Sequence, residues 1–126
     1  MTSTIPAATV ESWVRSYFKA SQSGDAQVWF ATFAEGAVVE DPVGTPPKST
    51  REEILAQGTG FVEAFKQVGL YESFIHVNGL EAVAMWTGRA ITHDDQSLSF
   101  EGIDLFEFNE TGKITLLRGF WTPPPF

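Results

Sequence analysis

The sequence predicts an α+β fold in which N-terminal helices pack on a strongly curved, mainly antiparallel sheet. In the first expected helix, residues 8–21, Val10, Val14 and Tyr17 recur at helical spacing. From Leu70 onward the spacing becomes that of strands, and turn-forming residues separate four of them. We expect these strands near residues 71–77, 82–92, 97–108 and 113–122. A curved sheet packed on helices leaves a conical pocket between the two layers.

A second helix and an early strand are expected between the first helix and the proline-rich loop. Gly24 ends the first helix, because glycine readily adopts the backbone conformation that closes a helix. Asp25 is a favourable N-cap for a short helix that we expect to reach Phe33. One strand should follow at Val38, ahead of the loop.

A third helix is predicted after the loop. Thr50 and Glu53 have the spacing of a capping box, and the apolar residues that follow continue a helical pattern through Phe65. Gly58 and Gly60 each weaken the middle of this helix by about 1 kcal/mol relative to alanine. We therefore expect a kink or break there.

Length and composition limit the protein to one domain, residues 1–126, and to a few classes of function. The net charge of −8 argues against nucleic acid as a partner. The absence of cysteine excludes disulfides and thiolate chemistry and suits a reducing cytoplasm. With no run of 18 apolar residues, we expect a soluble, cytoplasmic protein without a membrane partner. The 11 phenylalanines suit either a cavity with apolar walls or a plain core, and composition does not separate the two.

One short stretch, from Val38 to Gly44, combines apolar residues with a carboxylate next to a proline. Val38 and Val39 favour a buried strand, and Pro42 biases Asp41 toward an extended conformation. The carboxylate of Asp41 would then lie at the edge of the core, where it is a candidate general base. An ordinary turn that begins with aspartate is the alternative interpretation.

Asp104 is the second unusual carboxylate, because it shares one face of its predicted strand with three phenylalanines. Burial raises the pKa of a carboxylic acid above its reference of about 3.9 and favours the neutral form, which can donate a hydrogen bond. An ion pair with Arg89 or Arg118, or a bulge that turns the side chain outward, would be the structural alternatives. Tyr17 also points inward, so its hydroxyl needs either a site or a backbone carbonyl as partner.

Together these residues resemble the bacterial Δ5-3-ketosteroid isomerases of the SnoaL-like, NTF2-like superfamily. The resemblance rests on Tyr17, on the segment from Phe33 to Gly44 with its Glu-Asp-Pro-Val-Gly sequence, and on Asp104 with the phenylalanines that follow it. It spans nearly the whole chain. It implies a single domain with the NTF2-like (cystatin-like) cone, in which helices pack against a strongly curved sheet.

The resemblance also implies a role for each of the three residues. Asp41 would be the general base that moves a proton between two carbons, and Tyr17 and protonated Asp104 would form the oxyanion hole for a dienolate. It implies a small apolar substrate such as a steroid or similar fused-ring ketone, no metal or organic cofactor, and a homodimer. The candidate substrate-binding walls are aromatic, namely Trp86, Phe100, Phe120 and Trp121.

The chain departs from these isomerases at two positions. Isomerases of this type often carry further tyrosines that support the one in the first helix, and here Phe33 and Gly58 stand in their place. Tyr71 is the only other tyrosine in the chain. We expect Tyr17 to be less well positioned as a result, with reduced or redirected activity.

Two further classes of function remain open. Another SnoaL-like enzyme, of the polyketide cyclase or epoxide hydrolase type, could use Asp41 with His76 or Arg89. A non-catalytic pocket could instead bind an apolar metabolite, or the domain could serve in dimerisation. An enzyme requires Tyr17 and Asp104 to converge on one point with Asp41 across from it, which distinguishes these interpretations.

Overall fold

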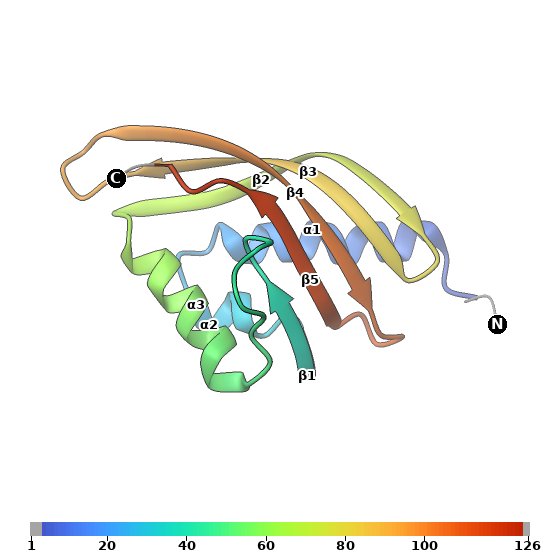
Figure 1. Ribbon diagram of the computed structural model, residues 1–126. Coiled ribbons are helices and arrows are strands. Elements are labelled where there is room, and N and C mark those ends of the chain that lie inside the picture. Colours follow the sequence, from blue (N-terminus) through green and yellow to red (C-terminus); the bar gives the residue numbers. More distant parts are fainter. Residues whose placement is uncertain (1–3, 125–126) are drawn as a thin grey trace.

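The computed structural model describes residues 4–124 and has three helices on one side of a five-stranded sheet (Figure 1). The helices are α1 (Ala7–Ser21), α2 (Ala26–Phe30) and α3 (Arg51–Glu63). The strands are β1 (Phe33–Glu40), β2 (Gln67–Asn78), β3 (Glu81–Ile91), β4 (Ser97–Phe108) and β5 (Ile114–Trp121). The predicted α+β fold is confirmed, and β4 has the bounds expected from the sequence.

The sheet is curved and mainly antiparallel, with strand order β1-β5-β4-β3-β2. The exception is β1, which pairs with β5 in parallel. Figure 1 shows the long strands arching over the helices, so the helices cover the concave face. Within residues 4–124, no helix has the length and apolar character needed to cross a membrane.

The second helix is shorter than predicted, and Phe33 begins β1 instead of ending α2. Asp25 caps α2 as expected, since its carboxylate accepts a hydrogen bond of 2.8 Å from the Gln27 N–H. Phe33 pairs with Ile114 of β5, whose N–H donates to the carbonyl of Thr32. This long-range pairing overrides the helical pattern in the local sequence.

The third helix has the predicted capping box but no break at its glycines. Thr50 Oγ1 accepts from the Glu53 N–H and Glu53 Oε1 accepts from the Thr50 N–H, both at 3.1 Å. The helix continues through Gly58, where a Cβ atom would lie only 2.6 Å from Cε3 of Trp29. Glycine at this position allows α3 to approach α2 closely, so its use is close packing and not a kink.

The core lies between α1 and the concave face of the sheet. Val10, Val14 and Phe18 of α1 are fully buried, together with Phe106 of β4 and Leu117 of β5. These side chains fix α1 along the sheet, and Tyr17 is held on the same inner face of the helix.

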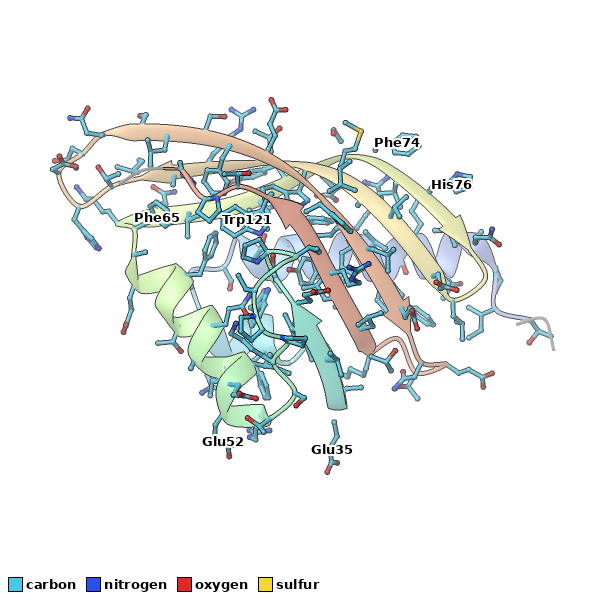
Figure 2. All side chains as sticks on the ribbon, in the orientation of Figure 1. Glu35, Glu52, Phe65, Phe74, His76 and Trp121 are labelled. Carbon is cyan, nitrogen blue, oxygen red and sulfur yellow. The ribbon has the colours of Figure 1, made fainter. Side chains whose placement is uncertain are left out.

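The convex face of the sheet carries four large apolar side chains side by side, which we call the apolar row. Phe74, Met85, Ile103 and Phe120 are each between 43% and 53% exposed, and they are paired in that order across β2, β3, β4 and β5. Figure 2 shows Phe74 on the side of the sheet away from the helices, whereas Trp121 lies beneath the sheet.

Candidate active site

A cavity of about 280 Å³ lies between the helices and the concave face of the sheet. Its volume is near the lower end of the range for small-molecule sites. Its walls are mainly apolar, but several polar side chains from different elements reach it. The most important of these are Tyr17, Asp41, Gln57, Trp86, Asp104 and Trp121.

Gly119 of β5 is the point at which the two carboxylates approach each other. On one side it pairs with Asp104 of β4. On the other side Glu40 of β1 pairs with Arg118, and this register places the next residue, Asp41, beside Gly119. The Val43 N–H donates to the Gly119 carbonyl at 2.7 Å, which fixes the loop after Asp41. A Cβ atom on Gly119 would collide with Asp41 Oδ1 and would lie 3.1 Å from Asp104 Oδ1. The strand pairing therefore brings both carboxylates to one place.

The carboxylate of Asp41 is held by two hydrogen-bond donors. Trp121 Nε1 donates to Oδ1 at 2.5 Å, and Gln57 Nε2 donates to Oδ2 at 3.3 Å. Burial of the carboxylate raises the pKa of Asp41 to about 6, although the Trp121 hydrogen bond and the charge of Lys48 act in the opposite direction. At neutral pH the group is therefore mainly ionised and can accept a proton.

Asp104 is almost completely buried, with 1% of its surface exposed. Burial raises its pKa well above the ordinary value, and the charge of Asp41 raises it further. The indole N–H of Trp86 lies near enough to lower this pKa, yet neither Trp86 Nε1 nor Asp104 Oδ2 makes a hydrogen bond of acceptable geometry. Asp104 is neither turned outward nor in any ion pair of the described residues. Its surroundings therefore favour the protonated form of the acid.

Tyr17 is 2% exposed and is surrounded by phenylalanine rings. Its ring contacts Phe106 and Phe33 edge-on, with centroid distances of 5.0 and 6.3 Å. Burial raises the pKa of Tyr17 well above 10, and the charges of Asp104 and Asp41 raise it further, while the Trp29 indole acts in the opposite direction. The phenol therefore stays protonated and can donate a hydrogen bond into the cavity.

Two of the four predicted aromatic walls line the cavity, and two do not. Trp86 and Trp121 line it, with ring centroids 6.0 Å apart. Phe100 stacks on Trp121 from within the core at 5.7 Å, and it supports the wall without forming it. Phe120 belongs to the exposed apolar row, because its side chain points to the opposite face of β5 from Trp121.

The basic residues considered as partners for the two carboxylates do not line the cavity. His76 and Arg89 are exposed and do not line the cavity, and Figure 2 shows His76 outside the sheet. Arg89 lies over the ring of Tyr71, and Arg118 pairs with Glu40 at 2.8 Å. A reaction that uses Asp41 with His76 or Arg89 is therefore incompatible with the structure.

Three residues at the site were not identified from the sequence as site residues. Gln57 was missed, although a polar residue beside Gly58 on the inner face of a helix is a usable signal. Trp29 lines the cavity next to Tyr17 and lies within the short helix predicted after Asp25. Gly119 could have been noticed as a glycine inside a strand, which often marks a close approach by another group.

The arrangement combines a carboxylate that is mainly ionised at neutral pH with two groups whose raised pKa values favour their protonated, donor forms. Asp41 can take and return a proton, while Tyr17 and Asp104 can stabilise negative charge on an oxygen in a cavity with mainly apolar walls. The chemistry available at the site is therefore proton transfer with stabilisation of an oxyanion.

Comparison with known proteins shows the family to which the chain belongs. The SnoaL-like domain family matches residues 14–117. A steroid Delta-isomerase from Nocardioides simplex is 30% identical over 121 residues, which cover 92% of each chain. The epoxide hydrolase/cyclase-like enzyme SalBIII, described in pyran ring formation in the polyether salinomycin, superposes with a TM-score of 0.82 at 22% identity, covering 91% of this chain and 92% of its own. A putative polyketide cyclase from Xanthomonas campestris pv. campestris superposes with a TM-score of 0.79 at 18% identity, covering 92% of each chain. The chain therefore belongs to the SnoaL-like family.

Proposed function

We propose that the protein is a steroid Delta-isomerase-like enzyme, which moves a carbon–carbon double bond into conjugation with a ketone. The observation that carries this proposal is the presence of Tyr17, Asp41 and Asp104 in one cavity, with raised pKa values that favour the protonated forms of Tyr17 and Asp104. The 30% identity to a steroid Delta-isomerase over most of the chain supports it.

The proposed reaction is an intramolecular proton transfer through a dienolate. Asp41 removes a proton from the carbon between the ketone and the double bond, which leaves a negative oxygen that accepts hydrogen bonds from Tyr17 and Asp104. The protonated Asp41 then returns the same proton to the far carbon of the conjugated system. Proton and charge balance without a cofactor, because the enzyme ends in the state in which it began.

The walls of the cavity favour a flat, apolar ketone. Trp86, Trp121 and Phe61 supply aromatic surface, and the phenol and the two carboxyl groups supply most of the polar chemistry. A steroid or similar fused-ring ketone has this distribution, with its reactive oxygen at one end.

The proposal is tested with a 3-oxo-Δ5 steroid, by following the absorbance of the conjugated enone that forms. Asp41→Asn should reduce turnover about 10²- to 10⁴-fold, since it removes the base and keeps the shape of the side chain. Asp94→Asn, in the exposed turn after β3, is the matched control. Absence of turnover by the wild-type protein, or equal turnover by the Asp41 variant, would reject the proposal.

A second reaction is favoured by the closeness of Asp41 and Asp104 at Gly119. Neutral Asp104 could give its proton to an epoxide oxygen while Asp41 takes the proton of an attacking hydroxyl group, so that one C–O bond breaks and another forms. This reaction does not require the Tyr17 phenol. Tyr17→Phe should therefore impair isomerisation and leave epoxide opening nearly unchanged.

We also propose that the protein is a homodimer in which the apolar row packs against a second copy. Phe74, Met85, Ile103 and Phe120 form a continuous apolar strip on the convex face, and such strips are uncommon on monomers. A symmetric pair would cover the strip on both copies at once.

A further inference from the structure

Three buried polar atoms of the described residues have no hydrogen-bond partner, and all three belong to residues that line the cavity. They are Gln57 Oε1, Trp86 Nε1 and Asp104 Oδ2. Buried polar groups nearly always have partners, so such a cluster needs an explanation. Its position at the cavity indicates that a ligand supplies the missing partners.

Trp86 is the one member of this cluster that can only donate. The carboxyl group of Asp104 donates or accepts according to its proton, and Gln57 Oε1 only accepts, whereas an indole nitrogen carries a hydrogen and has no lone pair to offer. The partner of Trp86 must therefore be an acceptor atom. Asp104 Oδ2 is nearby but does not meet hydrogen-bond geometry, so an acceptor on a ligand can complete the bond.

The position of the Trp86 ring is fixed by its neighbours. Gly102, its partner on β4, leaves the space that the ring occupies, since a Cβ atom there would lie 2.8 Å from Cε2 of Trp86. Phe100 packs edge-on against the ring with a centroid distance of 5.9 Å. The side chain is only 3% exposed. The N–H is thus held in place before any ligand arrives.

We propose that Trp86 Nε1–H donates a third hydrogen bond to the substrate oxygen that Tyr17 and Asp104 also bind. This proposal rests on the isomerase function proposed above. The Trp86 indole lies near enough to the Asp104 carboxyl group to lower its pKa. The contact does not have the geometry of a hydrogen bond, so the indole proton can turn to an acceptor on the ligand.

A third donor distinguishes the transition state from the bound substrate. A ketone oxygen has two lone pairs, which the donors from Tyr17 and Asp104 can occupy. An enolate oxygen has three, and its negative charge strengthens each bond it accepts. The third donor is therefore used fully only as charge develops, which increases the rate of the reaction more than the affinity for substrate.

The kinetic test is Trp86→Phe, which removes the N–H and keeps an aromatic ring. We expect kcat for a 3-oxo-Δ5 steroid to fall about 10- to 100-fold with KM nearly unchanged. Trp13→Phe is the matched control, because Trp13 packs on Phe108 outside the cavity lining. An equal effect of both substitutions, or a change confined to KM, would overturn the proposal.

A binding test on the wild-type protein does not depend on turnover. Equilenin, a steroidal phenol that mimics the dienolate when ionised, is titrated while the four indole N–H signals are followed by NMR, with each assigned from its Trp→Phe variant. We expect the Trp86 signal to move downfield and the Trp13 signal to stay in place. A Trp86 signal that stays unmoved up to the solubility limit of equilenin overturns the inference. If the signal moves but no steroid is turned over, the isomerase proposal fails while the donor role of Trp86 stands.

Discussion

Asp41 and Gly119 are packed so closely that a Cβ atom on Gly119 would collide with Oδ1 of the carboxylate. The two residues lie on neighbouring segments, the loop after β1 and the parallel strand β5. Asp104 approaches Gly119 from β4 on the other side. One glycine therefore provides the space for both carboxylates.

Gly119→Ala should abolish most isomerase activity. The added methyl group would push the Asp41 carboxylate away from Trp121 and crowd Asp104, so that base and donors no longer face one substrate. Steady-state kinetics, with circular dichroism to verify folding, measures this effect. Wild-type kcat/KM in a folded Gly119→Ala protein would show that this close packing is not needed.

The pH dependence of kcat/KM should follow the ionisation of Asp41. Activity should rise with pH through about 6 and then level off, because the base must be ionised and the pKa of Asp41 is raised to about 6. The charge of Lys48 lowers the pKa of Asp41, and the charge of Asp41 in turn raises the pKa values of Asp104 and Tyr17.

Removing a hydrogen-bond donor to Asp41 should move the rise of kcat/KM to higher pH, since each donor favours the ionised form of Asp41. Trp121→Phe should shift it further than Gln57→Leu, because its hydrogen bond is 2.5 Å long against 3.3 Å. A shift to lower pH in either variant would contradict the assignment of Asp41 as the base.

Asp104 should make the folded protein less stable as pH rises. Its folded pKa lies well above that of the unfolded chain, so the folded state retains a proton that the unfolded state has lost. The free energy of unfolding should then fall by up to about 1.4 kcal/mol per pH unit above about pH 4, until the folded pKa is reached. Asp104→Asn should make this dependence shallower. Urea unfolding between about pH 4 and about 8 measures it, and equal slopes in both proteins over this whole range would refute an elevated Asp104 pKa.

The two glycines of α3 should respond in opposite ways to alanine. Gly58→Ala should destabilise the fold, because the new Cβ atom would lie 2.6 Å from Trp29. Gly60→Ala should stabilise it by about 1 kcal/mol, since no atom lies within 4 Å and alanine favours the helix. Thermal or urea unfolding of the pair compares them directly. Stabilisation by both substitutions would mean that the helices α2 and α3 are not closely packed at Gly58.

Met85→Glu should convert the proposed dimer into a monomer. A charge in the middle of the apolar row would be buried without a partner in a dimer and would face water in a monomer. Val28→Glu is the matched control, because Val28 is also exposed but lies on α2. Sedimentation velocity measures the result. A wild-type protein that sediments only as a monomer would reject the dimer.

Local patterns in the sequence determined the elements and one part of the site. The capping residues Asp25 and Thr50 marked the starts of two helices, and the apolar alternation in β4 placed Asp104 on the buried face. These features depend on residues close together in the chain, so short-range physics is sufficient. Alternation along β5 likewise places the consecutive residues Phe120 and Trp121 on opposite faces of the sheet. The sequence-based prediction that both line the cavity did not take this into account.

Only the tertiary structure decided how the parts meet. The parallel pairing of β1 with β5 joins segments far apart in sequence, and its register, which no local pattern specifies, is what brings Asp41 to Gly119 and Asp104. In the same way, Trp29 occupies the space that Gly58 leaves open, and the indole of Trp86 comes to lie beside Asp104 without a protein partner. Burial of a carboxylate can be read from alternation along one strand, but its neighbours depend on long-range packing.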